Sequence, residues 1–240
     1  MEYRTLHPWE VSPQEAVAIQ QRLRSQVRVE PLDARTVELV AGADLAFDRN
    51  SDTAYAGIVV LRLPSMEVVA QVGVQAETTF PYVPGLLSFR ETPPLLKAWE
   101  QLKVKPEALI CDGHGQAHPR RFGIACHLGL VFDVPTIGCA KSILVGHHGP
   151  LAREAGSYTA LRDGGEVIGA ALRTREGVSP VYVSIGHRVD LKGALELVMR
   201  CIRRTRVPET TRQAHLLVNA LRQGEEVSLR NGREQQGTLF

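Results

Sequence analysis

Three acidic residues that lie far apart in the sequence could hold a metal ion if the fold brings them together. Asp44 follows an apolar stretch of strand length, Asp112 follows a second one that ends in Cys111, and Glu91 lies between them in a helical segment. Ligands meet an α/β protein at the ends of its strands. Carboxylates held close together repel one another and raise each other's pKa, so cations must lie among them. Hard divalent ions, Mg²⁺ or Mn²⁺, suit such a set of oxygen ligands.

Each of these acids also has an ordinary structural explanation, because a single Asp after a strand commonly forms a turn or caps a helix. The residues after Asp112 leave two interpretations open. Glycines beside His114 let the backbone approach a ligand, and two histidines and two arginines can donate to an anion, but a glycine-rich turn before a basic helix start has the same composition. His114 and His118 are spaced like zinc ligands, yet no third ligand stands at a telling distance, which argues against zinc.

Two further segments combine a rigid backbone with side chains that suit nucleic acids. Tyr82 lies between Pro81 and Pro84, which stiffen the chain on either side of it. Such an aromatic residue either packs in the core or stacks on bases and wedges into a duplex. Lys141 ends an apolar strand, so it is either a solvated strand end or a phosphate contact near the carboxylates.

A cluster of basic residues lies near the C-terminus and consists of Arg200, Arg203, Arg204 and Arg206, followed by Arg212 and His215. The first three share one face of a predicted helix. A solvated helix end is the commoner explanation, although the same patch would serve as a nucleic-acid footprint. The net charge, 28 basic minus 26 acidic residues or +2, is too small to decide between them.

Composition places the chain among folded, soluble proteins, since 44% of its 240 residues are hydrophobic and 22% are charged. We expect one domain over 1–222 and a polar, mobile tail over 223–240. No apolar run is long enough to span a bilayer and no signal peptide opens the chain, so a cytoplasmic location is expected. The four cysteines lack metal or disulfide spacing and are expected to be buried, reduced thiols.

Hydrophobic periodicity predicts a mixed α/β sheet with helices on its faces. A helix capped by Ser12 opens the chain, and an antiparallel meander follows it. Helices and strands then alternate. The predicted strands are 36–43, 54–63, 66–74, 108–111, 136–140, 166–173 and 181–185, and the later helices are 85–91, 92–102, 121–132, 191–204 and 209–222.

Taken together, these segments resemble the endonuclease V family, deoxyinosine-specific repair nucleases with an RNase H-like core. The matching motifs run in the family's order over most of 10–222. They are AGAD at 41–44, PYVPGLLSFRE at 81–91, DGHGQAHPR at 112–120, PTIGCAK at 135–141 and SIGH at 184–187. The resemblance implies an RNase H-like mixed sheet, with three antiparallel strands followed by parallel crossovers, Asp44 on the first strand and Asp112 on the fourth.

The resemblance also implies a role for each matching residue. Asp44, Glu91 and Asp112 match the metal ligands, and Tyr82 matches the wedge that fills the space left by the damaged nucleotide. Three residues match polar groups near the catalytic centre, namely Lys141, His118 and His215. The residues that match the hypoxanthine pocket are Gly85, Leu87, Gly113, Gly123, Ile124 and Gly138.

The activity implied by the resemblance is metal-dependent DNA hydrolysis. With Mg²⁺, for which Mn²⁺ can substitute, the family cuts the second phosphodiester bond 3′ to deoxyinosine and leaves a 3′-hydroxyl and a 5′-phosphate. An inosine-specific ribonuclease and a non-catalytic inosine-binding protein are the alternatives. The expected partner is DNA containing deoxyinosine, with inosine-containing RNA as a second candidate; a membrane is not expected, and the protein is expected to be a monomer.

Overall fold

The computed structural model describes residues 1–48, 51–225 and 230–231. Its helices are α1 (Pro13–Leu23), α2 (Leu87–Gln101), α3 (Ile124–Phe132), α4 (Leu191–Arg200) and α5 (Glu209–Arg222), and a 3₁₀ turn (Arg24–Gln26) follows α1. The strands are β1 (Leu39–Phe47), β2 (Thr53–Arg62), β3 (Glu67–Glu77), β4 (Ala108–Cys111), β5 (Thr136–Ala140), β6 (His147–His148), β7 (Tyr158–Asp163), β8 (Glu166–Leu172), β9 (Val181–His187) and β10 (Arg230–Asn231).

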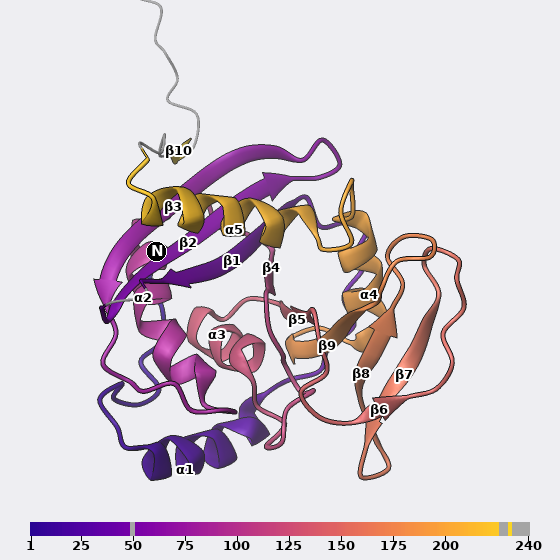
Figure 1. Ribbon diagram of the computed structural model, residues 1–240, viewed down its shortest axis with the longest axis horizontal. Helices are drawn as coiled ribbons and strands as arrows, with labels where there is room; N and C mark the ends of the chain where they lie inside the picture. The colour runs from indigo at the N-terminus through magenta and orange to yellow at the C-terminus, as the bar shows by residue number, and fades with distance from the viewer. Residues whose placement is uncertain (49–50, 226–229, 232–240) are drawn as a thin grey trace, which may run out of the picture.

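The described strands form one mixed sheet in the order β10-β3-β2-β1-β4-β5-β9-β8-β7-β6 (Figure 1). Strands β1 to β3 are antiparallel, and β4 and β5 continue the sheet parallel to β1. This confirms the predicted mixed sheet and its order of antiparallel and parallel strands. From β9 outward the strands are antiparallel again. Strands β6 and β7 were not predicted, because β7 buries only Leu161 and so lacks the alternation of a half-buried strand.

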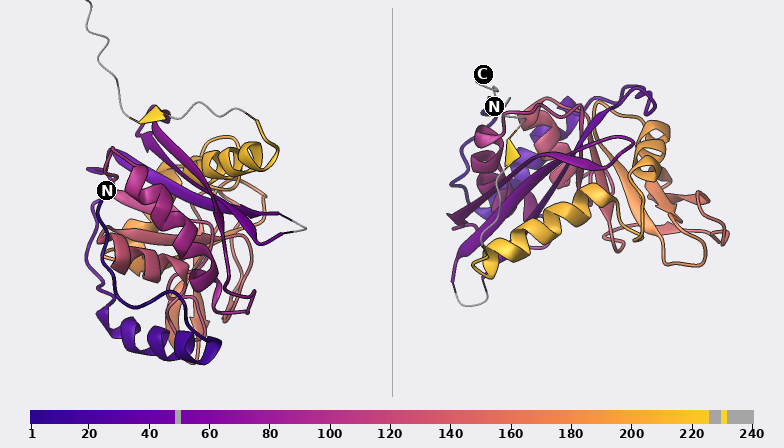
Figure 2. Two further views of the ribbon diagram at one scale, coloured as in Figure 1. Left: turned by 90° about the vertical axis from the view of Figure 1, so that its left-hand side faces the viewer. Right: turned by 90° about the horizontal axis from the view of Figure 1, so that it is seen from above.

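The helices cover both faces of the sheet (Figure 2). Alternate residues of β1 point to opposite sides, so Ala41 and Ala43 pack with α2 and α3, whereas Val40 packs with α4. Helix α5 lies on the same face as α4. Helix α1 packs its Leu23 against Phe89 of α2 and against Phe122, which precedes α3. Its predicted start is confirmed, since Ser12 and Glu15 form a capping box.

A row of glycines on three adjacent strands forms a shallow trough for α5. Gly42 of β1, Gly57 of β2 and Gly73 of β3 all face this helix. A Cβ at Gly42 would lie 2.2 Å from the backbone of Thr210, and one at Gly73 would lie 2.3 Å from Leu221. The missing side chains therefore allow α5 to approach the sheet closely, with its backbone at Gly42 and with its side chains at Gly57 and Gly73.

The predicted break between 85–91 and 92–102 is wrong, because α2 runs unbroken through Pro93 and Pro94. A proline inside a helix removes a hydrogen bond to the carbonyl four residues earlier. Pro94 thus frees the carbonyl of Arg90, which instead accepts a hydrogen bond of 3.2 Å from the Thr78 hydroxyl. A partner from outside the helix compensates for the lost bond.

Several other element boundaries also differ from the prediction. The helix expected from 121 begins at Ile124, because Arg121 adopts a left-handed conformation with φ of 56° and bonds Asp163 and Glu166 of the β7–β8 hairpin. Helix α4 ends at Arg200 rather than 204. Asp44 lies inside β1 rather than after it, since the strand extends to Phe47.

The basic cluster is largely used to bind backbone carbonyls. Arg200 donates to the carbonyls of Ala34 and Val37, Arg203 to that of Pro64 and Arg206 to that of Pro180. Arg212 pairs with Glu209. These arginines therefore tie α4 and the segment after it to neighbouring loops, which favours the structural explanation of the cluster. All four cysteines are buried and free, as predicted.

Two predictions concern regions that the structure covers only in part. Of the tail 223–240, the described residues are 223–225 and the two of β10, which pair with β3; the remainder lies outside the described residues. Within the described ranges, none of the helices combines the length and apolar character needed to cross a bilayer.

We expect Gly42→Ala to destabilise the fold, because its methyl group would collide with the Thr210 backbone rather than with a movable side chain. Overpacking of this kind costs about 1–3 kcal/mol. The free energy of unfolding, measured by urea titration, should fall by that amount. Gly149→Ala is the matched control, since a methyl group there would have no neighbour within 4 Å, and it should change stability by less than about 0.5 kcal/mol. Equal effects of the two substitutions would contradict the trough as described.

Candidate active site

The register of β1 and β4 brings two of the predicted acids to the same edge of the sheet. These strands are parallel, with Ala43 opposite Cys111, so Asp44, which is still within β1, and Asp112, which directly follows β4, take neighbouring positions. Glu91 approaches from α2. Burial, together with the charges of Asp44 and Asp112, raises the pKa of Glu91 to about 8. The three carboxylates therefore share one electrostatic environment.

Asp44 is held by a chain of hydrogen bonds from α5. His215 Nδ1 donates to Asp44 Oδ2 over 2.8 Å, and the Leu45 amide donates to Asp44 Oδ1 over 2.9 Å. Asn219 Nδ2 donates to His215 Nε2 over 3.0 Å, and Arg222 donates to the Asn219 side-chain oxygen. Because His215 Nε2 accepts, the ring proton lies on Nδ1 and points to Asp44. Burial raises the pKa of Asp44, while the bond from His215 lowers it.

Asn219 and Arg222 were not identified from the sequence. They follow His215 by four and seven residues, a spacing that places all three on one face of a helix. This periodicity was the available signal. The direction of the side chains toward Asp44, however, depends on how α5 sits in its glycine trough, which a local pattern does not encode.

Lys141 provides the positive charge nearest to Asp112. It follows β5, and its ammonium group forms an ion pair with Asp112 Oδ2. The side chain of Lys141 is 47% exposed, whereas that of Asp112 is 20% exposed, so the ammonium group reaches solvent at the rim of the site. A cation in this position is able to contact an approaching anion.

The charges of these residues fit a divalent cation. Three carboxylates supply the hard oxygen donors that Mg²⁺ or Mn²⁺ prefers, and no ion pair within the described ranges involves Glu91. The ligands are not closed around an ion, because no three His, Cys, Asp or Glu side chains of the described residues form a ready metal site. His215 and Lys141 each engage one of the carboxylates. The donor set thus fits the ion chemically without being preformed around it.

A cavity of about 390 Å³ opens beside Asp112 and Lys141. Of the residues predicted to form a base pocket, Gly85, Leu87, Gly113 and Ile124 line it. Tyr82 and His118 line it as well. Four further lining residues lie outside the motifs identified in the sequence, namely Gln20, Ser142, Ile143 and Leu144. Ile143 and Leu144 are 38% and 43% exposed, so an apolar lip faces solvent here.

Gly123 and Gly138, also predicted for the pocket, lie behind its wall. A Cβ at Gly123 would be 2.3 Å from the carbonyl oxygen of His114, and one at Gly138 would be 2.5 Å from the amide of Gly115. Both glycines therefore allow the 113–115 loop to lie close to α3 and β5. These two glycines position the 113–115 loop and do not themselves line the cavity.

His118 is buried, and both of its ring nitrogens are engaged with backbone. Nε2 donates to the Gly85 carbonyl over 2.9 Å, and Nδ1 accepts from the Arg120 amide over 3.2 Å. Burial lowers the pKa of His118 to about 4. In this arrangement His118 is a neutral ring that holds the loop carrying Tyr82.

Tyr82 is 74% exposed and stands at the mouth of the cavity. The backbone before it is fixed by Arg90, whose guanidinium donates to the Phe80 carbonyl over 2.5 Å. The aromatic ring is thus presented to solvent by a fixed loop and does not belong to the core. Of the two interpretations of this residue, the structure favours the exposed one.

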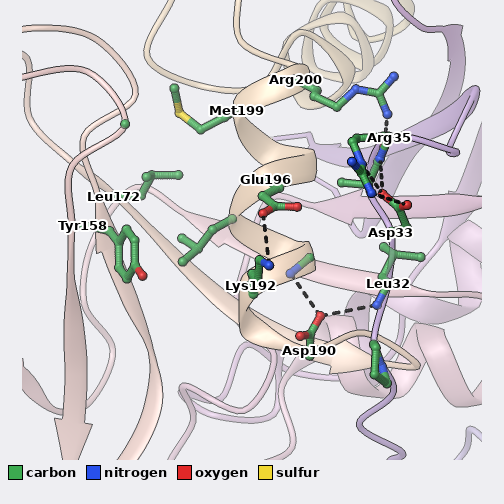
Figure 3. Close-up of a pocket in the computed structure, with 15 residues that line it drawn as sticks. Leu32, Asp33, Arg35, Tyr158, Leu172, Asp190, Lys192, Glu196, Met199 and Arg200 are labelled. Carbon is green, nitrogen blue, oxygen red and sulfur yellow. Dashed lines mark hydrogen bonds and ion pairs between the residues drawn. The ribbon is translucent and has the colours of Figure 1, made fainter.

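A larger cavity, of about 760 Å³, lies elsewhere, between α4, the segment 31–35 and β7 (Figure 3). Its polar groups are mostly paired with one another. Asp33 binds Arg35, Lys192 lies 4.0 Å from Glu196, and Asp190 caps α4 by accepting from the amide of Gly193. None of the predicted site residues lines this cavity.

Comparison with known proteins agrees with the motifs. The model of the family Endonuclease V matches residues 21–216. The endonuclease V of Myxococcus xanthus is 54% identical over 217 residues, which cover 90% of this chain and 92% of the relative. That of Roseiflexus castenholzii is 52% identical over 89% of this chain and 95% of its own.

Solved structures show the same fold. The endonuclease V of Streptomyces avermitilis superposes with a TM-score of 0.87 at 42% identity, covering 93% of this chain and 99% of its own. That of Ciona intestinalis, solved with a 23mer DNA containing an inosine followed by a ribo-adenosine, gives 0.80 at 26% identity over 89% and 99%. Sequence, fold and site geometry therefore agree that this chain belongs to the endonuclease V family, with its RNase H-like sheet.

Proposed function

We propose that this protein is an endonuclease that recognises deoxyinosine in DNA and hydrolyses the second phosphodiester bond on its 3′ side, leaving a 3′-hydroxyl and a 5′-phosphate. The observation that carries the proposal is the juxtaposition of a cavity with a carboxylate cluster. Asp112 and Lys141 belong to both, and the exposed Tyr82 stands at the cavity mouth. A base taken out of the duplex and the backbone to be cut could thus be bound together.

The lining of the cavity suits hypoxanthine. This base presents an O6 acceptor and an N1–H donor, whereas adenine presents the opposite pattern. Backbone amides and carbonyls near Gly113, which lines the cavity, can pair with that edge without a charged side chain. Guanine shares the edge but adds an amino group, which the apolar wall of Leu87 and Ile124 would exclude by shape. Tyr82 would occupy the space that the flipped nucleotide leaves in the duplex.

In our proposal the hydrolytic machinery is divided among three kinds of residue. Asp44, Glu91 and Asp112 would hold Mg²⁺ or Mn²⁺, which supplies Lewis acidity and lowers the pKa of water. His215 orients the Asp44 carboxylate through its Nδ1 proton. Lys141 places an exposed positive charge where a phosphate would approach Asp112. His118 supports the chemistry indirectly by fixing the loop at Gly85.

The decisive measurement is cleavage of a labelled duplex that carries one deoxyinosine, with Mg²⁺ and with chelator. A single nick at the second phosphodiester bond 3′ to the lesion is expected only with Mg²⁺. Asp44→Asn should lower kcat/KM by about 10³-fold, because several kcal/mol of charge stabilisation are lost. Asp52→Asn, an exposed acid in the turn before β2, is the matched control and should cleave like the unmodified protein. Intact inosine substrate at high enzyme concentration would refute the proposed activity.

Tyr82→Ala should weaken binding to the lesion while leaving the carboxylates unchanged. Stacking of an aromatic ring on a base contributes about 1–3 kcal/mol, so the Kd for an inosine duplex should rise about 5- to 150-fold. Fluorescence anisotropy in Ca²⁺ would measure this without cleavage. Tyr158→Ala removes another exposed ring, 62% exposed on β7 and remote from the cavity, and should bind normally. A Tyr82→Ala protein that binds like the parent would exclude the wedge role.

Metal binding can be tested through stability rather than cleavage. Between the Glu91 pKa of 4.5 in an unfolded chain and about 8 in the folded protein, the folded state binds more protons, so metal-free stability should fall as pH rises. Mg²⁺ should offset this loss at pH 8 by binding the ionised carboxylates. Thermal unfolding at pH 5 and pH 8 should show a smaller pH dependence and a smaller Mg²⁺ effect for Glu91→Gln. Identical pH and Mg²⁺ responses in both proteins would count against the site.

RNA is the second candidate substrate, because the Ciona intestinalis relative was solved with a ribo-adenosine after the inosine. Comparing cleavage of inosine in DNA, in RNA and in a hybrid strand distinguishes a DNA endonuclease from an inosine-specific ribonuclease. A non-catalytic inosine-binding protein would instead bind the lesion in both presence and absence of Mg²⁺ and never cleave it.

A further inference from the structure

Gln20 is a polar side chain with no exposed surface, located on the buried face of α1. It lies four residues after Ala16 and three before Leu23, both of which are buried in the same hydrophobic cluster as Phe89 and Phe122. An apolar residue would fit this position better unless the amide had hydrogen-bond partners. Gln20 also precedes by one residue the segment that the family model matches. Its burial therefore calls for a specific explanation.

The hydrogen bonds of Gln20 fix the orientation of its amide. Nε2 donates to the carbonyls of Gly85 and Phe122 over 3.0 and 3.1 Å. Oε1 accepts from Arg120 Nε over 2.5 Å. Both amide hydrogens face carbonyl oxygens, and the amide oxygen faces a guanidinium. The reverse orientation would place the amide oxygen against the two carbonyl oxygens and the amide NH₂ against the guanidinium. One side chain thus links α1 to two separate loops of the site.

The Gly85 carbonyl accepts from three side chains at once. Besides Gln20, Arg120 Nη2 donates over 2.7 Å and His118 Nε2 over 2.9 Å. Gly85 has a φ of +79°, and a Cβ there would lie 2.8 Å from Arg120 Nη2. The carbonyl, and with it the end of the Tyr82 loop, is therefore held in one place.

The loop is fixed at its other end as well, since Arg90 binds the Phe80 carbonyl. Tyr82 lies between these two anchors and is 74% exposed, so little besides the backbone sets the position of its ring. The anchor at Gly85 depends in part on α1, which carries none of the proposed metal ligands. A change in that anchor should alter where Tyr82 stands without altering the carboxylates.

We propose that Gln20 is a positioning residue for lesion recognition, which fixes the Gly85 carbonyl and thereby the Tyr82 loop and the cavity mouth. This inference rests on the proposed function and adds to it a residue of α1. It assigns to α1 a role in selecting the lesion rather than in covering the core alone.

The test compares Gln20→Met with the parent protein on inosine and undamaged duplexes. Met keeps the length and apolar bulk of the side chain but removes all three hydrogen bonds. Losing a bond to the loop should raise KM for the inosine duplex about tenfold and lower the preference for inosine similarly, with a smaller change in kcat. Gln21→Met, on an exposed neighbouring position, is the control and should leave both constants unchanged.

A double-mutant cycle separates positioning from a general loss of structure. If Gln20 acts through the loop, adding Gln20→Met to Tyr82→Ala should raise KM no further. Fully additive effects, or an unchanged KM and preference in Gln20→Met, would overturn the inference. Should Gln20→Met not fold, Gln20→Glu serves in its place, because it keeps the Arg120 partner and turns an oxygen toward the two carbonyls. A parent protein that fails to nick inosine DNA would instead refute the proposed function, and this inference with it.

Discussion

Repulsion among three partly buried carboxylates is the constraint around which this structure is organised. Burial raises the pKa of Asp44 and of Glu91, and the negative charges of neighbouring carboxylates raise both further. Two of the three acids have a positive or proton-donating partner. His215 contacts Asp44, and Lys141 forms an ion pair with Asp112. Glu91 has no ion pair within the described ranges, and a hard cation beside it would favour loss of its proton, which makes the site suited to such an ion.

The elements that create this cluster come from separate parts of the chain. Parallel pairing of β1 and β4 sets two acids side by side, α2 contributes the third, and α5 delivers the histidine. The recognition side of the site is built independently, from the loop before α2 and the 113–115 loop, and α1 braces it through Gln20. The carboxylate cluster and the cavity thus have Asp112 and Lys141 in common, but different elements of the fold position their other residues.

Much of the sheet and the location of the site could be predicted from the sequence, because strand periodicity and short motifs are local signals. The motifs indicated the family, and the expectation that Asp44 and Asp112 follow strands indicated the cluster, although Asp44 lies within β1. What the sequence could not show depends on partners from elsewhere in the chain. Helix α2 continues through two prolines because Thr78 serves a freed carbonyl, and the arginines near the C-terminus bind carbonyls of distant loops. Gln20 and Asn219 escaped notice for the same reason.

The glycine trough has a consequence for how this architecture can vary. Side-chain packing is adaptable, since one residue can shrink where its neighbour grows, but contact between a helix backbone and a bare strand offers no such exchange. At Gly42, where the strand meets the Thr210 backbone, the approach of α5 therefore depends on the absence of a single carbon atom, whereas Gly57 and Gly73 face side chains of α5. Relatives that retain the contact between the aspartate and the histidine should therefore also retain glycine at the position of Gly42. This glycine is then as informative about the site as the acids themselves.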